Sequence, residues 1–252
     1  MKRNYALLFL AVIVGAFCLL SSCDPKVAVE DVQYGVGEKG PTGGYIFYDC
    51  DADNDSGNAD GLISTECGWR FLEAAPADLV VVDGVPTVDK TASGYLSVVF
   101  GCYRTTDDGS NLYVNGTTTY NAADCTGAAI GTGKTNTQLL VNAMGAETYS
   151  SSSGSTKTAA YAAKLCDDLT YTIKGVTYSD WFLPSKDELN LMYVNLHIAG
   201  LGGFADNYYW SSSEDSYYSY SAWLQYFGSG SQNYGSRHIS NRVRPVRAFL
   251  TN

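Results

Sequence analysis

Short hydrophobic runs separated by polar turns occupy both ends of this chain, a pattern that favours β-strands. In the first half, strands are predicted at residues 45–48, 68–75 and 95–103. The run at 71–75 is short enough that the start of a helix is the alternative. In the last part, strands are predicted at residues 208–210, 221–227 and 242–249.

Apolar positions at helical spacing predict helices in the middle of the chain. One begins at a cap near Asn136 and continues to Met144, and a second covers residues 156–169. The third is marked by Ser185 and Glu188, which have the spacing of a capping box. The pattern therefore predicts an α+β fold: a compact domain with an antiparallel sheet, two to three helices and long irregular loops.

The first 22 residues have the features of a lipoprotein signal peptide. Lys2 and Arg3 precede an uncharged stretch at residues 4–20, and the sequence Leu-Ser-Ser-Cys ends at Cys23. The uncharged stretch is close to the minimum length for a bilayer span, so an uncleaved anchor is the alternative. The Leu-Ser-Ser-Cys motif favours cleavage before Cys23 and acylation of its thiol.

This interpretation divides the chain into a signal peptide (1–22), a tether (23–36) and a folded domain (37–252). Several acyl chains on Cys23 would hold the protein on a membrane almost permanently. We therefore expect a membrane-anchored lipoprotein of the cell envelope, outside the cytoplasm. Asp24 acts as an inner-membrane retention signal in some lineages and not in others, so the leaflet stays open, with the cell surface favoured.

The charge balance narrows the range of partners. The chain has 26 acidic and 16 basic residues, a formal net charge of -10. An acidic surface of this size repels nucleic acid and anionic lipid and serves mainly solubility. No nucleic-acid partner is expected, and nothing in the sequence predicts the oligomeric state.

The chain contains seven cysteines. Cys18 lies in the signal peptide and Cys23 is the predicted acylation site. In an oxidising compartment the remaining five are expected to pair in part. Proximity along the chain favours two disulfides and one unpaired helical residue: Cys50–Cys67, Cys102–Cys125 and Cys166. Other connectivities stay open, and the absence of a CxxC motif gives no support to a zinc knuckle or a thioredoxin-like centre.

An acidic segment at residues 51–60 places oxygen ligands on alternate positions, as calcium-binding loops do. The EF-hand pattern requires Gly and Glu where this chain has Ser56 and Leu62. A looser calcium site and a solvated turn are the two remaining interpretations, and calcium is the only cofactor considered. The candidate ligands are Asp51, Asp53, Asp55 and Asp60.

Residues 130–135 contain Gly-Lys-Thr and therefore resemble a phosphate-binding loop. The Walker pattern requires glycine five residues before Gly133, where this chain has Ala128. We expect a turn before a helix at this position and no nucleotide. The chain has only two histidines, His197 and His238, and no GxSxG or HExxH motif. No catalytic residues are assigned, and the protein is not expected to be an enzyme.

Tyrosines are concentrated between residues 207 and 241, among Ser, Asn and Gly. Exposed tyrosine rings can stack on sugars or fill protein pockets, and arginines suit carboxylate and sulfate. The candidate ligand-binding residues are Tyr208, Tyr217, Tyr218, Tyr220, Tyr234, Arg237 and Arg242. Structural roles are the alternative to ligand binding for some aromatic and arginine residues in this part of the chain. Trp210, Trp223 and Tyr226 are expected to lie in the core. Arg242, Arg244 and Arg247 are expected to pair with acidic residues across the sheet.

Three segments carry a resemblance to a known family. They are residues 180–189 (DWFLPSKDEL), 209–214 (YWSSSE) and 243–247 (VRPVR). Together they resemble the C-terminal domain of Lcl-type collagen-like adhesins, a family catalogued as a domain of unknown function. Residues 43–48 and 130–134 also fit, so the resemblance covers nearly all of residues 40–249.

The resemblance implies a fold similar to C-type lectins and formylglycine-generating enzymes. The studied adhesins bind sulfated glycosaminoglycans and mediate attachment. This chain has no collagen-like Gly-X-Y stalk and its body is acidic, so trimerisation and polyanion binding are not carried over to it. We expect non-catalytic binding of an extracellular glycan or protein ligand. The alternative is a structural envelope lipoprotein without a small ligand.

Overall fold

The computed structural model describes residues 33–52, 67–94, 96–101, 127–149 and 156–251. Contacts divide the chain into Met1–Gln33 and Tyr34–Asn252, and the described helices and strands belong to the second unit. None of the helices within the described ranges is long and apolar enough to cross a membrane.

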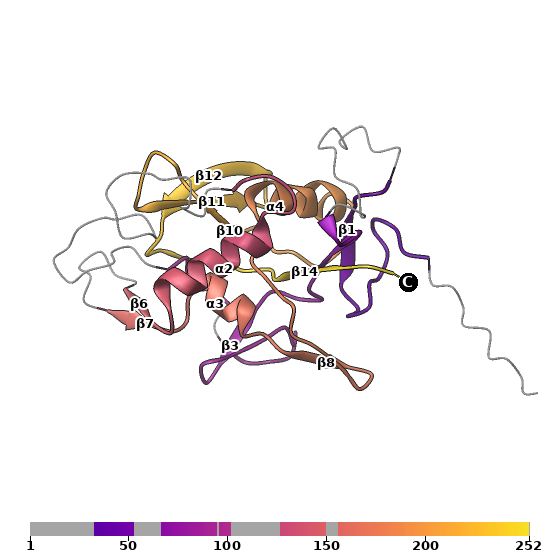
Figure 1. The fold of residues 1–252 in the computed structure, drawn as a ribbon, viewed down its shortest axis with the longest axis horizontal. Coiled ribbons are helices and arrows are strands. Elements are labelled where there is room, and N and C mark those ends of the chain that lie inside the picture. Colours follow the sequence, from indigo (N-terminus) through magenta and orange to yellow (C-terminus); the bar gives the residue numbers. More distant parts are fainter. Residues whose placement is uncertain (1–32, 53–66, 95, 102–126, 150–155, 252) are drawn as a thin grey trace, which may run out of the picture. The chain divides into compact units, whose positions relative to one another are not determined.

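The fold is α+β, as the sequence pattern predicts (Figure 1). The helices are α2 (Gly133–Met144), α3 (Ala162–Asp167) and α4 (Lys186–Met192), and α4 continues into a π-helical turn, η1 (Tyr193–His197). The C-type-lectin likeness stays a prediction.

Two three-stranded sheets organise the described residues, and every strand pair is antiparallel. The first has the order β1-β2-β14 and consists of β1 (Tyr45–Asp49), β2 (Phe71–Ala74) and β14 (Val246–Phe249). The second has the order β10-β11-β12 and consists of β10 (Tyr208–Glu214), β11 (Ser221–Tyr226) and β12 (Ser231–Ser236). The C-terminal strand β14 therefore pairs with β2, far away in the sequence.

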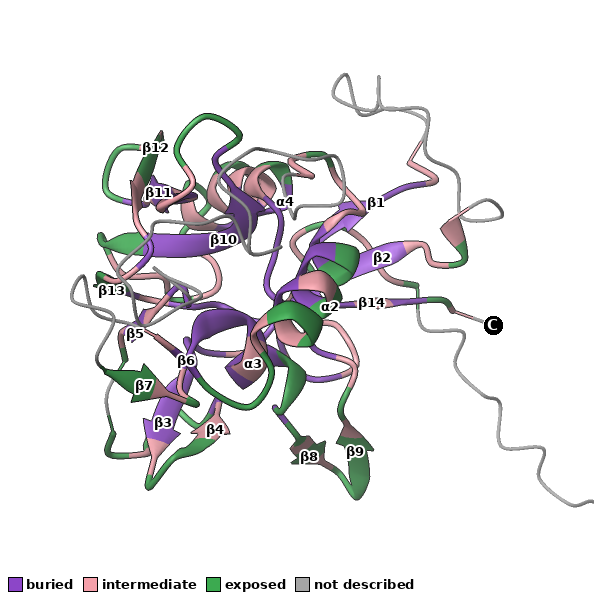
Figure 2. Cartoon of the chain, turned by 60° about the vertical axis from the view of Figure 1, so that its left-hand side comes forward, coloured by how far each residue is buried: buried purple, intermediate pink, exposed green. Residues whose placement is uncertain are grey.

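The other strands form two-stranded ribbons. They are β3 (Val80–Val82) with β4 (Val85–Thr87), β5 (Val98–Val99) with β13 (Ser240–Asn241), β6 (Thr148–Tyr149) with β7 (Lys157–Thr158), and β8 (Tyr171–Ile173) with β9 (Val176–Tyr178). Figure 2 shows β8 and β9 as a largely exposed hairpin, in contrast to the buried strand β10.

Two hydrophobic clusters account for most of the core. One packs α2 and α3 against β10 and β11, and includes Phe100, Leu140, Tyr161, Leu165 and Trp210. The other packs α4 and η1 against the first sheet, and includes Phe47, Leu72, Phe182, Met192 and Phe227. The apolar faces of the helices thus cover both sheets, and burial of such faces is the main driving force for folding.

Several predicted elements differ from the observed ones. The helix predicted at 156–169 is shorter, because Tyr161 has an extended backbone and α3 begins after it. Of the strand predicted at 95–103, residues 96–101 are described, and among these Val98 and Val99 form strand β5. Residues 71–74 form strand β2 rather than the start of a helix. Neither the hairpins β3–β4 and β8–β9 nor the strand β12 was expected.

Candidate functional site

Four aromatic rings form a continuous surface on the second sheet, which we call the aromatic platform: Tyr218, Tyr220, Trp223 and Tyr234. The ring of Tyr218 lies 5.7 Å from that of Tyr220 and 5.4 Å from that of Tyr234. The ring of Tyr234 in turn lies 5.9 Å from Trp223. Tyr218 is 44% exposed and Tyr234 51% exposed, so part of this surface faces solvent.

The register of β11 and β12 places Trp223 directly opposite Tyr234, which is the arrangement in which cross-strand side chains touch. The loop between β10 and β11 adds Tyr218 and Tyr220. Its turn is held by Asp215, whose carboxylate accepts hydrogen bonds from the backbone N–H groups of Tyr217 (2.7 Å) and Tyr218 (3.1 Å). The same turn leaves Tyr217 beside the platform with 88% of its surface exposed.

One positive charge lies at the edge of the platform. The Lys186 ammonium group lies 3.9 Å from the centre of the Trp223 ring, a cation–π contact. Lys186 is the first residue of α4, and its backbone is held to the sheet because its N–H donates to Ser213 and its carbonyl accepts from Gln232. The platform therefore combines a broad aromatic area with a cation at its edge.

The structure brings the rings of Tyr218, Tyr220 and Tyr234 together, leaves Tyr217 exposed next to Tyr218 in the same turn, and separates Tyr208 from them. Tyr208 is 39% exposed and its ring contacts Tyr226 at 4.8 Å. Tyr226 is three positions after Trp223 on the same strand, so the two side chains point to opposite faces of the sheet. Of the three aromatic residues expected in the core, Trp210 is fully buried, whereas Trp223 and Tyr226 are half-buried.

The structure corrects the expectation that Arg237 lies on the ligand-binding surface. Its side chain is fully buried and forms an ion pair with buried Glu214. Buried charges require such a partner, and the pairing keeps Arg237 beneath the loop that carries the platform, where its backbone N–H donates to Tyr220. Arg242 pairs with Asp78 and keeps only 21% of its side chain exposed.

The expected pairing of arginines with acidic residues is confirmed. Arg244 binds Asp78, and Arg247 binds Asp180 and Glu73. Burial, the larger influence, raises the pKa of Glu73, while hydrogen bonds from Thr42 and the charge of Arg247 oppose that rise.

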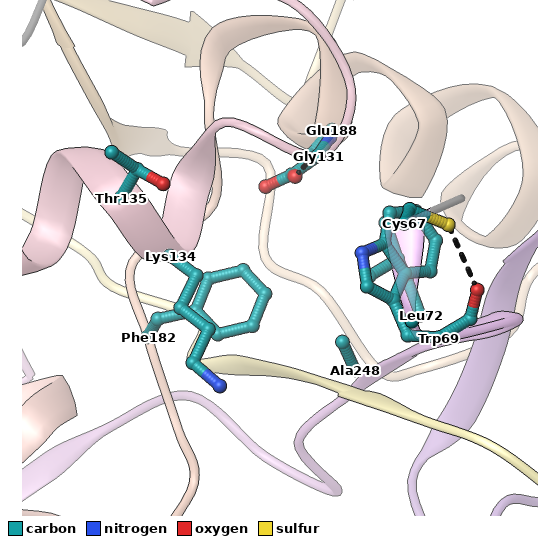
Figure 3. Close-up of a pocket in the computed structure, with 10 residues that line it drawn as sticks. Cys67, Trp69, Leu72, Gly131, Lys134, Thr135, Phe182, Glu188 and Ala248 are labelled. Atoms are coloured by element: carbon teal, nitrogen blue, oxygen red, sulfur yellow. Dashed lines mark hydrogen bonds between the residues drawn. The ribbon is translucent and has the colours of Figure 1, made fainter. Parts of the chain in front are cut away.

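The glycine-containing segment before α2 is occupied by an internal carboxylate (Figure 3). Glu188 Oε1 accepts hydrogen bonds from the backbone N–H of Gly131 at 2.8 Å and of Gly133 at 3.4 Å. Its Oε2 accepts from the N–H of Ser185 at 2.7 Å and completes the predicted capping box. A Cβ atom at position 133 would collide with this carboxylate, so only glycine fits there. The Glu188 carboxylate thus occupies the backbone N–H groups of this segment that could otherwise face an anion.

A cavity of about 310 Å³ lies next to Glu188. Its other lining side chains include Trp69, Lys134, Thr135, Phe182 and Cys67. Burial raises the pKa of Glu188 to about 7, although the three backbone N–H groups oppose the rise. Those N–H groups engage both carboxylate oxygens, so Glu188 is a structural acceptor at the wall of the cavity.

The sulfur atoms of Cys50 and Cys67 lie 3.9 Å apart, close to one another but not covalently bonded. Burial, followed by the influence of Cys67, raises the pKa of the Cys50 thiol to about 12. The predicted disulfide between them is therefore not formed in this structure, although the two residues are neighbours as expected. Cys166 is buried in α3 and forms no disulfide with any described residue. Cys102 and Cys125 lie outside the described residues.

Most of the acidic segment considered for calcium lies outside the described residues, including Asp53, Asp55 and Asp60. Asp51 is described, and its carboxylate lies 3.7 Å from the Arg70 guanidinium. No group of three or more candidate metal ligands exists within the described parts of the chain. The predicted acylation site Cys23 also lies outside the described residues.

Comparison with known families gives one match. Residues 134–247 match the Lcl C-terminal domain. The matched range begins in α2 and ends in β14, and it contains the whole aromatic platform and Glu188. It is narrower than the resemblance expected from the sequence, since residues 43–48 lie outside it. No curated protein matches the chain.

Proposed function

We propose that this protein with an Lcl C-terminal domain is a membrane-anchored lipoprotein whose extracytoplasmic domain binds a glycan or protein ligand without catalysis. The observation that carries the proposal is the aromatic platform, a run of touching and partly exposed rings on one face of a sheet. Lipid anchoring rests on the Leu-Ser-Ser-Cys motif that ends at Cys23.

The platform suits ligand binding because its rings are large, amphipathic and already ordered. Tyrosine and tryptophan bury a large area at low cost in conformational entropy, and their polar atoms supply hydrogen bonds at the edge. The ring contacts and the Asp215 turn fix the positions of Tyr218 and Tyr234 before a ligand arrives. Arg237 is buried, and Lys186 is the cation that the described residues place against the platform, which favours stacking over ion pairing as the main attraction.

Replacing both Tyr217 and Tyr218 with alanine is expected to weaken ligand binding by at least about tenfold, because truncating a tyrosine that anchors an interface costs about 2 kcal/mol or more. Binding would be measured on an array of sulfated, neutral and sialylated glycans. The matched control is Tyr208→Ala, an exposed tyrosine on the other face of the sheet, which should leave binding unchanged.

Salt separates the two kinds of attraction at the platform. In 1 M salt the Debye length is about 3 Å, so attraction by the half-buried Lys186 is reduced while ring stacking persists. We expect binding to survive. Equal binding by the double variant, or no binding to any class of glycan or candidate protein, would contradict the proposal and support a structural envelope lipoprotein.

Replacing Cys23 with alanine tests the anchor. Labelled palmitate is expected to be incorporated into the native protein and not into the variant, because the Cys23 thiol is the predicted acylation site. The mature native chain should begin at Cys23. A native protein that carries no label and keeps its signal peptide would contradict lipid anchoring while leaving the platform proposal standing.

A further inference from the structure

A second cavity, of about 330 Å³, lies away from the aromatic platform. Its polar lining comes from Asp78, Lys90, Ser93 and Arg242, and its apolar lining includes Val80 and Leu96. This volume is at the lower end of the range for small-molecule sites. It therefore fits a ligand about as large as a monosaccharide or an amino acid.

Positive charge exceeds negative charge around this cavity, although the protein as a whole is acidic. Asp78 is shared between two arginines: Arg244 donates to its Oδ1 from Nε and Nη2, at 2.9 and 2.6 Å. Arg242 donates to its Oδ2 from Nη1 at 2.9 Å. The hydroxyl of Tyr209 also donates to Oδ2. One carboxylate thus faces two guanidinium groups, and Lys90 adds a third positive charge to the cavity wall.

Arg242 binds its carboxylate differently from the other described arginines that pair with aspartate. Arg70 and Arg247 each present Nε and Nη2 together to the two oxygens of one aspartate. Arg242 contacts Asp78 through Nη1 alone, and its Nε is buried without a hydrogen-bond partner. A buried donor of this kind usually has a partner, and an unmade hydrogen bond to a charged group is costly.

We propose that this cavity binds the carboxylate of a small ligand, with the Arg242 guanidinium as the principal donor and Lys90 as a second cation. A carboxylate is planar and matches the parallel N–H groups of a guanidinium edge. The apolar wall at Val80 and Leu96 would contact the rest of the ligand. Two sources share this chemistry, a sugar acid and an amino acid or peptide end.

Equilibrium dialysis of the full-length protein in detergent tests the proposal with two matched pairs of labelled probes. D-glucuronate is compared with D-glucose, and N-acetylalanine with N-acetylalaninamide, so that each acid has a neutral counterpart of similar shape. We expect saturable binding of at least one acid, with its neutral counterpart at least about tenfold weaker, because a hydrogen bond to a charged group discriminates by that amount. The acid that binds identifies the source.

Arg242→Gln should weaken binding of that acid by at least about tenfold. The control is Arg70→Gln, another arginine paired with aspartate but remote from this cavity, which should bind like the native protein. Thermal unfolding verifies that each variant folds. If Arg242→Gln does not fold, the exposed Lys90→Gln gives the test, since a rim cation should also strengthen binding and make it weaken with salt.

Three outcomes would overturn the inference: neither acid binds, a neutral probe binds as well as its acid, or folded Arg242→Gln and Lys90→Gln both retain native affinity. The inference is independent of the aromatic platform. The Tyr217→Ala, Tyr218→Ala double variant should bind the acid normally, so failure of one proposal does not imply failure of the other.

Discussion

Replacing Asp78 with alanine is expected to lower the free energy of unfolding by about 3–5 kcal/mol, the usual effect of removing one partner of a buried ion pair. The variant would leave the buried Arg244 guanidinium without its carboxylate, and it would remove an acceptor from Arg242 and from the hydroxyl of Tyr209. Arg244 is almost entirely buried, so water cannot replace the lost contacts without a rearrangement of the core. Urea denaturation of the folded domain would measure the change.

Two further variants test whether burial of the ion pair causes the large loss of stability expected for Asp78→Ala. Asp168→Ala removes a pair with Lys164 that is partly exposed and four residues apart on the chain, and should change stability by only about 0.5 kcal/mol. Asp78→Asn keeps one carbonyl oxygen as an acceptor, so its loss of stability should lie between those of Asp78→Ala and Asp168→Ala. A loss of similar size for Asp78→Ala and Asp168→Ala would show that the Asp78 cluster contributes no more than a surface pair.

Replacing Glu188 with alanine is expected to cost about 3 kcal/mol of folding stability. Three backbone N–H groups, those of Gly131, Gly133 and Ser185, would lose their acceptor. Each unsatisfied buried donor costs about 1–3 kcal/mol, and water in the adjacent cavity could compensate in part. Asp187→Ala, in the same turn of α4 but with an exposed side chain, should have a much smaller effect.

The pH dependence of stability gives a second signature of Glu188. Burial raises its folded-state pKa to about 7 from its ordinary value of 4.5. Between these values the unfolded chain has released the proton and the folded chain still holds it, so stability falls as pH rises from about 4.5 to about 7. The fall is on the order of 3 kcal/mol. In unfolding measured across that pH range, Glu188→Ala should lose most of this fall and Asp187→Ala should keep most of it, because burial and not the Asp187 charge is the main cause of the raised pKa. A native protein with constant stability over this window would contradict the assignment.

Local patterns predicted much of the fold. The capping box of Ser185 and Glu188 depends on residues three positions apart, and it forms as expected. Strands β1, β2, β10, β11 and β14 all lie within predicted segments or overlap them. The predicted helix at 136–144 is extended toward its N-terminus in α2, because Glu188 accepts from the glycine N–H groups that precede it. The strand β12 was missed because its residues, Ser-Gln-Asn-Tyr-Gly-Ser, lack the apolar alternation that marks a strand.

The candidate surface was predicted only in part, for a reason that lies in tertiary pairing. Composition identified a segment rich in tyrosine, but the face on which each ring lies depends on strand register. The register of β11 and β12 joins Trp223 to Tyr234 and sends Tyr226, with Tyr208, to the opposite face. The burial of Arg237 could not be predicted either, because it requires the carboxylate of Glu214, which lies 23 positions earlier in the sequence.

The shared acceptor Glu188 also affects local unfolding at the starts of α2 and α4. Its two oxygens hold Gly131 and Gly133 before and at the start of α2, and Ser185 at the start of α4, although the two helices are far apart along the chain. Withdrawal of this single side chain would release the first turns of both helices at once. We therefore expect local fluctuations at the two helix starts to be coupled, so that both exchange their amide hydrogens as one cooperative unit.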